Sequence, residues 1–179
     1  MNIPEIKLGI IAVSRDCFPI SLSTKRRQSI VAEYGEGLYE CPITVENEKD
    51  ALAALDDVKS HDVNALVVFL GNFGPETPET LLCQKFDGPT MYIAAAEGDG
   101  DLINGRGDAY CGVLNCSYNL GMRHLKAYIP EYPVGMCQYD SRVCPHCPCH
   151  CRREKSENYH LWPTAAGFLC LQRSHQGIV

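Results

Sequence analysis

Apolar residues along the chain gather in short runs that are separated by longer segments of mixed character. A short continuous apolar run that ends in turn residues is typical of a strand buried on both faces of a sheet. We therefore expect strands at residues 6–13, 64–70 and 90–96, and a shorter, more mixed strand at 38–43.

Helices are expected between these strands, because apolar residues recur there with helical spacing. In the second helix Leu52, Leu55 and Val58 share one face, and in the first Ser21 or Ser23 is placed to cap the N-terminus. The expected helices cover residues 21–37, 46–62, a segment that ends at 84, and 110–126.

The alternation of strand and helix predicts an α/β fold with a parallel sheet and helices on both faces. Ligands of such folds bind beyond the carboxyl ends of the strands. This rule selects the loops after the first, third and fourth strands, which are SRDCFP (14–19), GNFGPE (71–76) and GDGDLINGRGDAY (98–110).

Charge and cysteine content change abruptly near residue 140. Residues 1–140 carry a net charge of −9, whereas residues 141–179 carry +3 and hold five of the 11 cysteines. An acidic body argues against a nucleic-acid-binding surface, which needs clustered Lys and Arg. A length of 179 residues suits one sizeable domain, and no apolar run approaches the ~20 residues of a membrane span. The first residues have no signal-peptide pattern, so we expect a cytoplasmic protein.

The first loop offers Arg15, Asp16 and Cys17 as candidate functional residues. An Arg beside an Asp at a strand end can bind a sugar hydroxyl or a carboxylate, since the guanidinium group is rigid and permanently charged. The alternative is a turn with a surface ion pair. Cys17 has no His near it in the sequence, which favours a small core residue over a nucleophile.

The second and third loops offer an aromatic ring and a group of carboxylates. GNFGPET matches neither a P-loop nor a dinucleotide fingerprint, and Phe73 within it either stacks on a sugar ring or folds back on the core. The third loop holds Glu97, Asp99, Asp101 and Asp108. Such a group can bind a hard cation, but its spacing is not that of an EF-hand, which favours a solvated acidic loop.

Several stretches of the chain resemble one family in order and in detail. They include KLGIIAVSRDCFP, GNFGPETPET, GRGDAYCG and LKAYIPEYPVG, within a match from about residue 5 to about residue 136. These blocks look like the amino-terminal domain of the L-fucose/L-arabinose isomerase-like sugar isomerases.

The resemblance implies a flavodoxin-like, Rossmann-like domain whose strand-end loops cover the sugar site of a neighbouring subunit. Members of the family are oligomeric aldose–ketose isomerases of carbohydrate metabolism, and a metal, usually manganese, orients the sugar oxygens there. By analogy Arg15 and Asp16 lie in the first substrate-facing loop, Phe73 covers the sugar, and Asp108 belongs to a third loop nearby. No residue matches the family's metal ligands or catalytic carboxylates, so we assign no catalytic residue, metal ligand or cofactor to this chain.

Residues 1–136 are therefore expected to form the isomerase-like domain, and residues 137–179 a disordered, Cys/His-rich tail outside the family. The tail contains CPHCPCHC, in which Cys144 and Cys147 have C-x-x-C spacing. This segment is either a zinc knuckle or a metal-scavenging tail, although structural zinc sites usually take a second ligand pair from across a turn.

A third interpretation is that the tail is read out of frame. Codons that the genetic code allows for Leu161–Ile178 read one base later as FGPRPQDFFACNAPIKG, which resembles the block with which the family continues. We favour this frameshift. The chain is then a truncated amino-terminal fragment that is inactive alone, with a stand-alone sugar-binding module and a small zinc protein as the alternatives.

Overall fold

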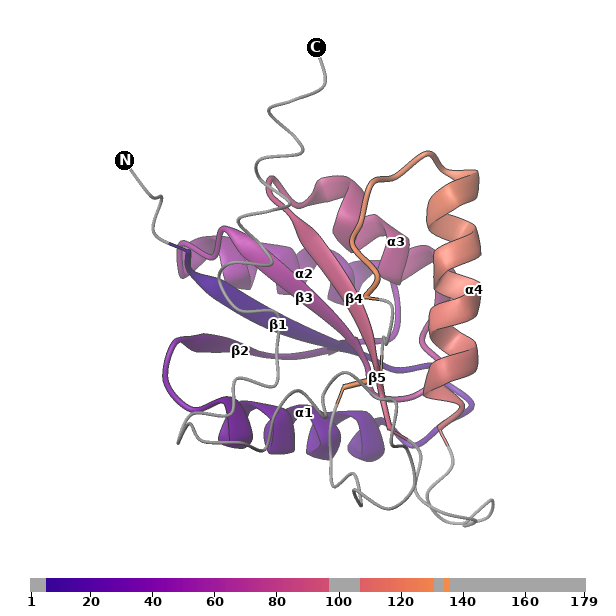
Figure 1. The fold of residues 1–179 in the computed structure, drawn as a ribbon, viewed down its shortest axis with the longest axis horizontal. Helices are drawn as coiled ribbons and strands as arrows, with labels where there is room; N and C mark the ends of the chain where they lie inside the picture. The colour runs from indigo at the N-terminus through magenta and orange to yellow at the C-terminus, as the bar shows by residue number, and fades with distance from the viewer. Residues whose placement is uncertain (1–5, 97–106, 131–133, 136–179) are drawn as a thin grey trace, which may run out of the picture.

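Strands and helices alternate along the chain, as expected, in the computed structural model, which describes residues 6–96, 107–130 and 134–135 (Figure 1). In chain order the elements of these residues are β1 (Leu8–Val13), α1 (Ile20–Tyr34), β2 (Leu38–Val45), α2 (Glu48–Ser60), β3 (Ala65–Leu70), α3 (Glu76–Lys85), β4 (Thr90–Ala95), α4 (Ala109–Met122) and β5 (Val134–Gly135).

The strands form one parallel sheet in the order β2-β1-β3-β4-β5. Helix α1 covers one face, and α2, α3 and α4 follow one another on the other (Figure 1). The predicted α/β class is thereby confirmed. The chain steps outward from β1 to β2 and then returns to β3 on the other side of β1. The carboxyl ends of β1 and β3 therefore form the topological switch point, where ligands of such sheets bind.

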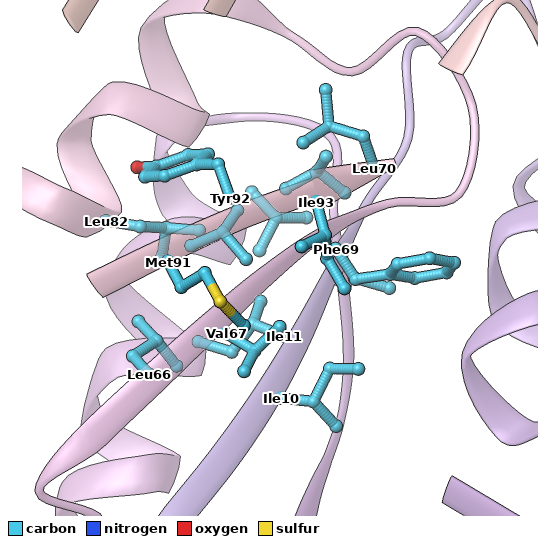
Figure 2. Close-up of a cluster of buried hydrophobic side chains, with 14 of the residues drawn as sticks. Ile10, Ile11, Leu66, Val67, Phe69, Leu70, Leu82, Met91, Tyr92 and Ile93 are labelled. Atoms are coloured by element: carbon cyan, nitrogen blue, oxygen red, sulfur yellow. The ribbon is translucent and has the colours of Figure 1, made fainter. Parts of the chain in front are cut away.

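The core lies around β1, β3 and β4, whose residues are buried along their whole length (Figure 2). Ile11, Phe69 and Tyr92 are among its largest fully buried side chains. The buried Tyr92 hydroxyl has a hydrogen-bond partner, because it donates to the backbone oxygen of Glu79 at 2.6 Å. Burial on both faces explains why these three strands are continuous apolar runs in the sequence.

Neither serine caps α1, which corrects the expected helix start. The N-cap residue is Pro19, and no side chain makes a capping hydrogen bond. Ser21 is exposed, whereas Ser23 is buried one turn inside the helix and donates from Oγ to the Val13 backbone oxygen at 2.7 Å. The hydroxyl of Ser23 therefore ties α1 to the end of β1.

Helix α2 buries the expected Val58 and partly buries Leu55, but Leu52 lies off the buried face. Ala51, Ala54 and Val58 are buried, while Leu52 is 49% exposed and Leu55 is only partly buried. The helix packs against both β2 and α3. Small alanine side chains allow the helix to approach β2 and α3 closely. Steric fit as well as hydropathy therefore decides which face of α2 is buried.

Several predictions fall on residues that are not described. The tail at 137–179, with Cys144 and Cys147, lies outside the described residues, as do Glu97, Asp99 and Asp101. The two-residue strand β5 was not predicted, because so short a segment carries no periodic pattern. No helix in the described part of the chain has the length and apolar character to cross a membrane.

Candidate functional site

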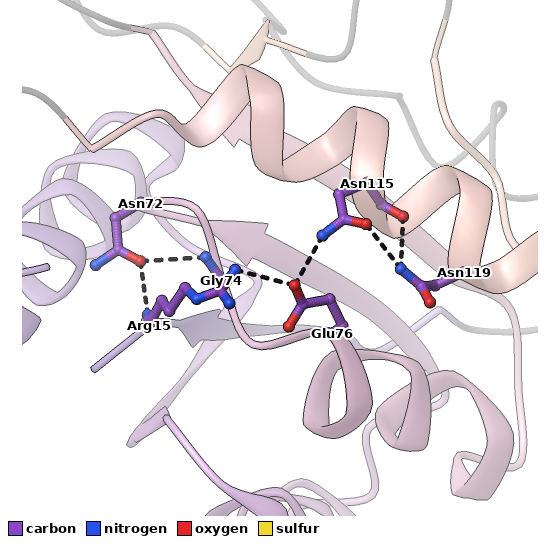
Figure 3. Close-up of polar contacts among 6 residues, drawn as sticks. All are labelled: Arg15, Asn72, Gly74, Glu76, Asn115 and Asn119. Carbon is purple, nitrogen blue, oxygen red and sulfur yellow. Dashed lines mark hydrogen bonds and ion pairs between the residues drawn. The ribbon is translucent and has the colours of Figure 1, made fainter. Parts of the chain in front are cut away.

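The loops after β1 and β3 meet at the switch point, where Asn72 joins them (Figure 3). The buried Asn72 side chain accepts at Oδ1 from the backbone N–H of Arg15 at 2.9 Å and from that of Gly74 at 3.3 Å. It donates from Nδ2 to the Ser14 hydroxyl at 2.8 Å. One side chain thus fixes both loops, and the backbone that carries Arg15 is held in place.

The Arg15 side chain lies between an aromatic ring and a carboxylate. Its Cζ is 4.9 Å from the centroid of the Phe73 ring, and its Nη1 donates to Glu76 Oε1 at 2.9 Å. The guanidinium group gains from both contacts, since an aromatic face attracts a cation. The Arg15 side chain is still 37% exposed, so part of its N–H surface faces solvent.

Glu76 is fixed from two sides, in the first turn of α3. Its Oε1 also accepts from Nδ2 of Asn115 on α4 at 2.9 Å, and Asn119 one turn later donates to Asn115 Oδ1 at 2.9 Å (Figure 3). The backbone N–H of Glu76 lowers the pKa of this carboxyl, and Asn115 and Arg15 lower it further, against an opposing rise from partial burial. Glu76 is therefore anionic at neutral pH.

The start of α4 lies directly against the Phe73 loop. A Cβ atom on Gly112 would overlap the backbone oxygen of Phe73, and one on Gly107 would lie 3.0 Å from Cβ of Asn72. Between them Asp108 adopts a left-handed conformation with φ of 50° at the N-cap position, without a capping hydrogen bond from its side chain. The third predicted loop therefore ends beside the other two.

The structure brings the predicted residues Arg15, Phe73 and Asp108 to one edge of the sheet. The alternative of an ion pair within the first loop is not what the described residues form, because Arg15 pairs with Glu76 and Asp16 is exposed. Cys17 is also exposed, which corrects its interpretation as a core residue.

Sequence reasoning missed the three residues that organise this edge, Asn72, Glu76 and Asn115. The available signals were weak: a polar amide directly after a buried strand, an acidic residue in the first turn of a helix, and an amide on the inner side of α4. Their partners lie 39 to 61 residues away in the sequence, so only the fold reveals the contacts.

The described residues at this edge offer polar and aromatic groups that can contact a ligand. No group of three His, Cys, Asp or Glu side chains within residues 6–96 and 107–130 could hold a metal ion. A manganese site therefore does not fit the described part of the chain, and no step is derived through that metal. The exposed N–H groups of Arg15, the Phe73 ring and the nearby carboxylates can bind a ligand that offers hydroxyl groups and an apolar face.

The strand order is that of a flavodoxin-like α/β domain, with an arginine, an aromatic ring and carboxylates at its switch point. The family model for the N-terminal domain of fucose/sulfoquinovose isomerase matches residues 9–142. The chain belongs to this sugar isomerase family, as the sequence resemblance predicted. Comparison with curated proteins finds no match.

Proposed function

We propose that this domain binds a sugar at the edge formed by Arg15, Phe73 and Asp108, as the amino-terminal part of an aldose–ketose isomerase. The observation that carries the proposal is the Arg15 guanidinium, which is fixed at the switch point against Phe73 and still partly exposed. A rigid donor fork beside an aromatic ring can hydrogen-bond sugar hydroxyls while the ring packs on their C–H groups.

Family membership supports the wider setting of this site. In the assembled enzyme, the strand-end loops would complete the sugar site of a neighbouring subunit in a homo-oligomer. Manganese and the carboxylates that move the proton would come from other domains, because the described residues provide no metal site. The sugar would be of the fucose or arabinose type, and Asp16 and Asp108 would accept from its hydroxyl groups.

Sugar binding by the 179-residue chain tests the proposal directly. L-Fucose and L-arabinose should shift backbone amide resonances in the three loops in a saturable NMR titration. Arg15→Ala should weaken binding by about tenfold or more, because it removes charge-assisted hydrogen bonds. Lys59→Ala removes a cation from the exposed end of α2 and serves as the control. Equal binding by all three proteins would refute the site.

An isomerase assay separates binding from turnover. The 179-residue chain with manganese should show no aldose–ketose conversion, because the described residues offer no group of side chains that could hold the metal. Manganese-dependent conversion would contradict this expectation. Stoichiometric zinc that survives dialysis would instead support a metal-binding role for the segment at 144–151.

A further inference from the structure

We infer that Glu76 is a specificity-determining residue that makes the Arg15 site select neutral sugars and reject sugars with an anionic group. The inference rests on the proposed sugar site and names its substrate class. An unpaired arginine at the mouth of a sugar site would favour a sulfonate or carboxylate, because its fork matches the geometry of such anions. Arg15 is not unpaired, and its partner is well fixed.

Glu76 holds the anion-binding position of Arg15. Its Oε1 lies 2.9 Å from Arg15 Nη1, where an oxygen of a bound anion would otherwise lie. Asn115 donates to the same oxygen from α4, also at 2.9 Å. A ligand anion can take this position on Nη1 only by displacing the carboxylate, and at the other N–H groups of Arg15 it would lie close to the Glu76 anion. A neutral hydroxyl needs only the N–H groups that Glu76 leaves open.

The other charges at this edge are balanced. Among the described residues the cations there are Arg15, Arg26 and Arg123. The Arg26 guanidinium donates to the backbone oxygen of Gly71 at 2.7 Å, and the Arg123 guanidinium donates to Thr77 Oγ1, next to Glu76, at 3.4 Å. The anions are Glu76, Asp16 and Asp108. Three cations against three anions give these described residues no net formal charge, so the rejection of a second anion rests on Glu76 at the Arg15 guanidinium, while sugar hydroxyls find carboxylate acceptors.

Two sugars that differ only in charge test the inference. Quinovose and sulfoquinovose share one hexose skeleton, and sulfoquinovose carries a sulfonate on C6. In NMR or calorimetric titrations of the 179-residue chain, quinovose should bind at least about tenfold more tightly than sulfoquinovose. Glu76→Gln keeps the shape of the side chain and removes its charge, so it should reduce this ratio by about tenfold, mainly by improving the binding of sulfoquinovose.

Control variants separate selectivity from stability. Glu76→Asp retains the charge and should retain a preference for quinovose, and Glu33→Gln removes an exposed charge from α1 and should leave the ratio unchanged. If Glu76 has only a structural role, Glu76→Gln should weaken the binding of both sugars equally, and that result would overturn the inference. Tighter binding of sulfoquinovose than of quinovose by the unaltered chain would overturn it while leaving the sugar site intact. No binding of quinovose, sulfoquinovose or L-fucose would refute the proposed site and the inference with it.

Discussion

Glu79 is a carboxyl buried inside the domain. The residue is 1% exposed, and its Oε2 has no hydrogen-bond partner. Burial raises the pKa of Glu79 well above its usual value, and the nearby Glu76 carboxylate raises it further, whereas Cys116, Arg15 and Arg123 oppose the rise. The Glu79 carboxyl, on the buried side of α3, therefore keeps its proton to a higher pH than an exposed glutamate does.

Replacement of Glu79 by Gln should stabilise the domain increasingly as the pH rises. The unfolded carboxyl ionises near its ordinary pKa of 4.5, whereas the folded one retains its proton to higher pH, so the native state binds more protons above pH 4.5. Stability of the unaltered chain therefore falls with pH in this window, by at most about 1.4 kcal/mol per pH unit, and Glu79→Gln removes that loss.

Urea denaturation between pH 5 and pH 8 measures the effect in Glu79→Gln. The difference in free energy of unfolding between this variant and the unaltered chain should grow with pH, whereas Glu33→Gln on the exposed side of α1 should show a nearly constant difference. A difference that does not change with pH would mean that Glu79 ionises normally in the folded state. The Glu79 carboxyl would then have partners that the structure does not account for.

At the scale of elements, the first turn of α4 packs directly against the backbone of the Phe73 loop. Gly112 in the first turn of the helix has no room for a Cβ atom, because the backbone oxygen of Phe73 occupies that position. Gly121 in the last turn is exposed, and a Cβ atom added there would have no neighbouring atom within 4 Å. The helix therefore contains a constrained glycine and an unconstrained one.

Alanine at these two glycines should change stability in opposite directions. Gly112→Ala forces α4 away from the loop and should destabilise the domain by about 1–3 kcal/mol, more than the gain in helix propensity offsets. Gly121→Ala meets no obstacle and should stabilise it by up to about 1 kcal/mol. Denaturation midpoints of the two variants measure both effects. Equal stabilisation by both would show that the helix does not approach Phe73 this closely.

The fold was largely predictable from local pattern, because β1, β3 and β4 are buried on both faces and must be apolar throughout. The hydrophobic pattern did not predict features that depend on contacts between residues far apart in the sequence. Leu52 is exposed because the buried face of α2 is set by its packing on β2 and α3. Arg15 pairs with Glu76, 61 residues away, rather than with adjacent Asp16, and only the sheet order brings those loops together.

At the scale of the whole molecule, the family match and the change in composition meet at the same point. The match covers residues 9–142, and CPHCPCHC begins at Cys144, where the acidic body gives way to a basic, cysteine-rich segment. We propose a change of reading frame as the origin of both, because a shifted frame discards the family pattern while it leaves every preceding residue unchanged.

The coding DNA decides between the proposed origins of the tail at residues 137–179. Sequencing through codons 136–142 and beyond should show the family's continuation in the +1 frame, with codons for Leu161–Ile178 that read as FGPRPQDFFACNAPIKG, followed by a long open frame. The third frame serves as the internal control, since it should be interrupted by stop codons and show no family pattern. A +1 frame that is closed by stops or reads without family pattern would instead identify the cysteines as encoded residues, and the zinc analysis of the purified chain would then test their function.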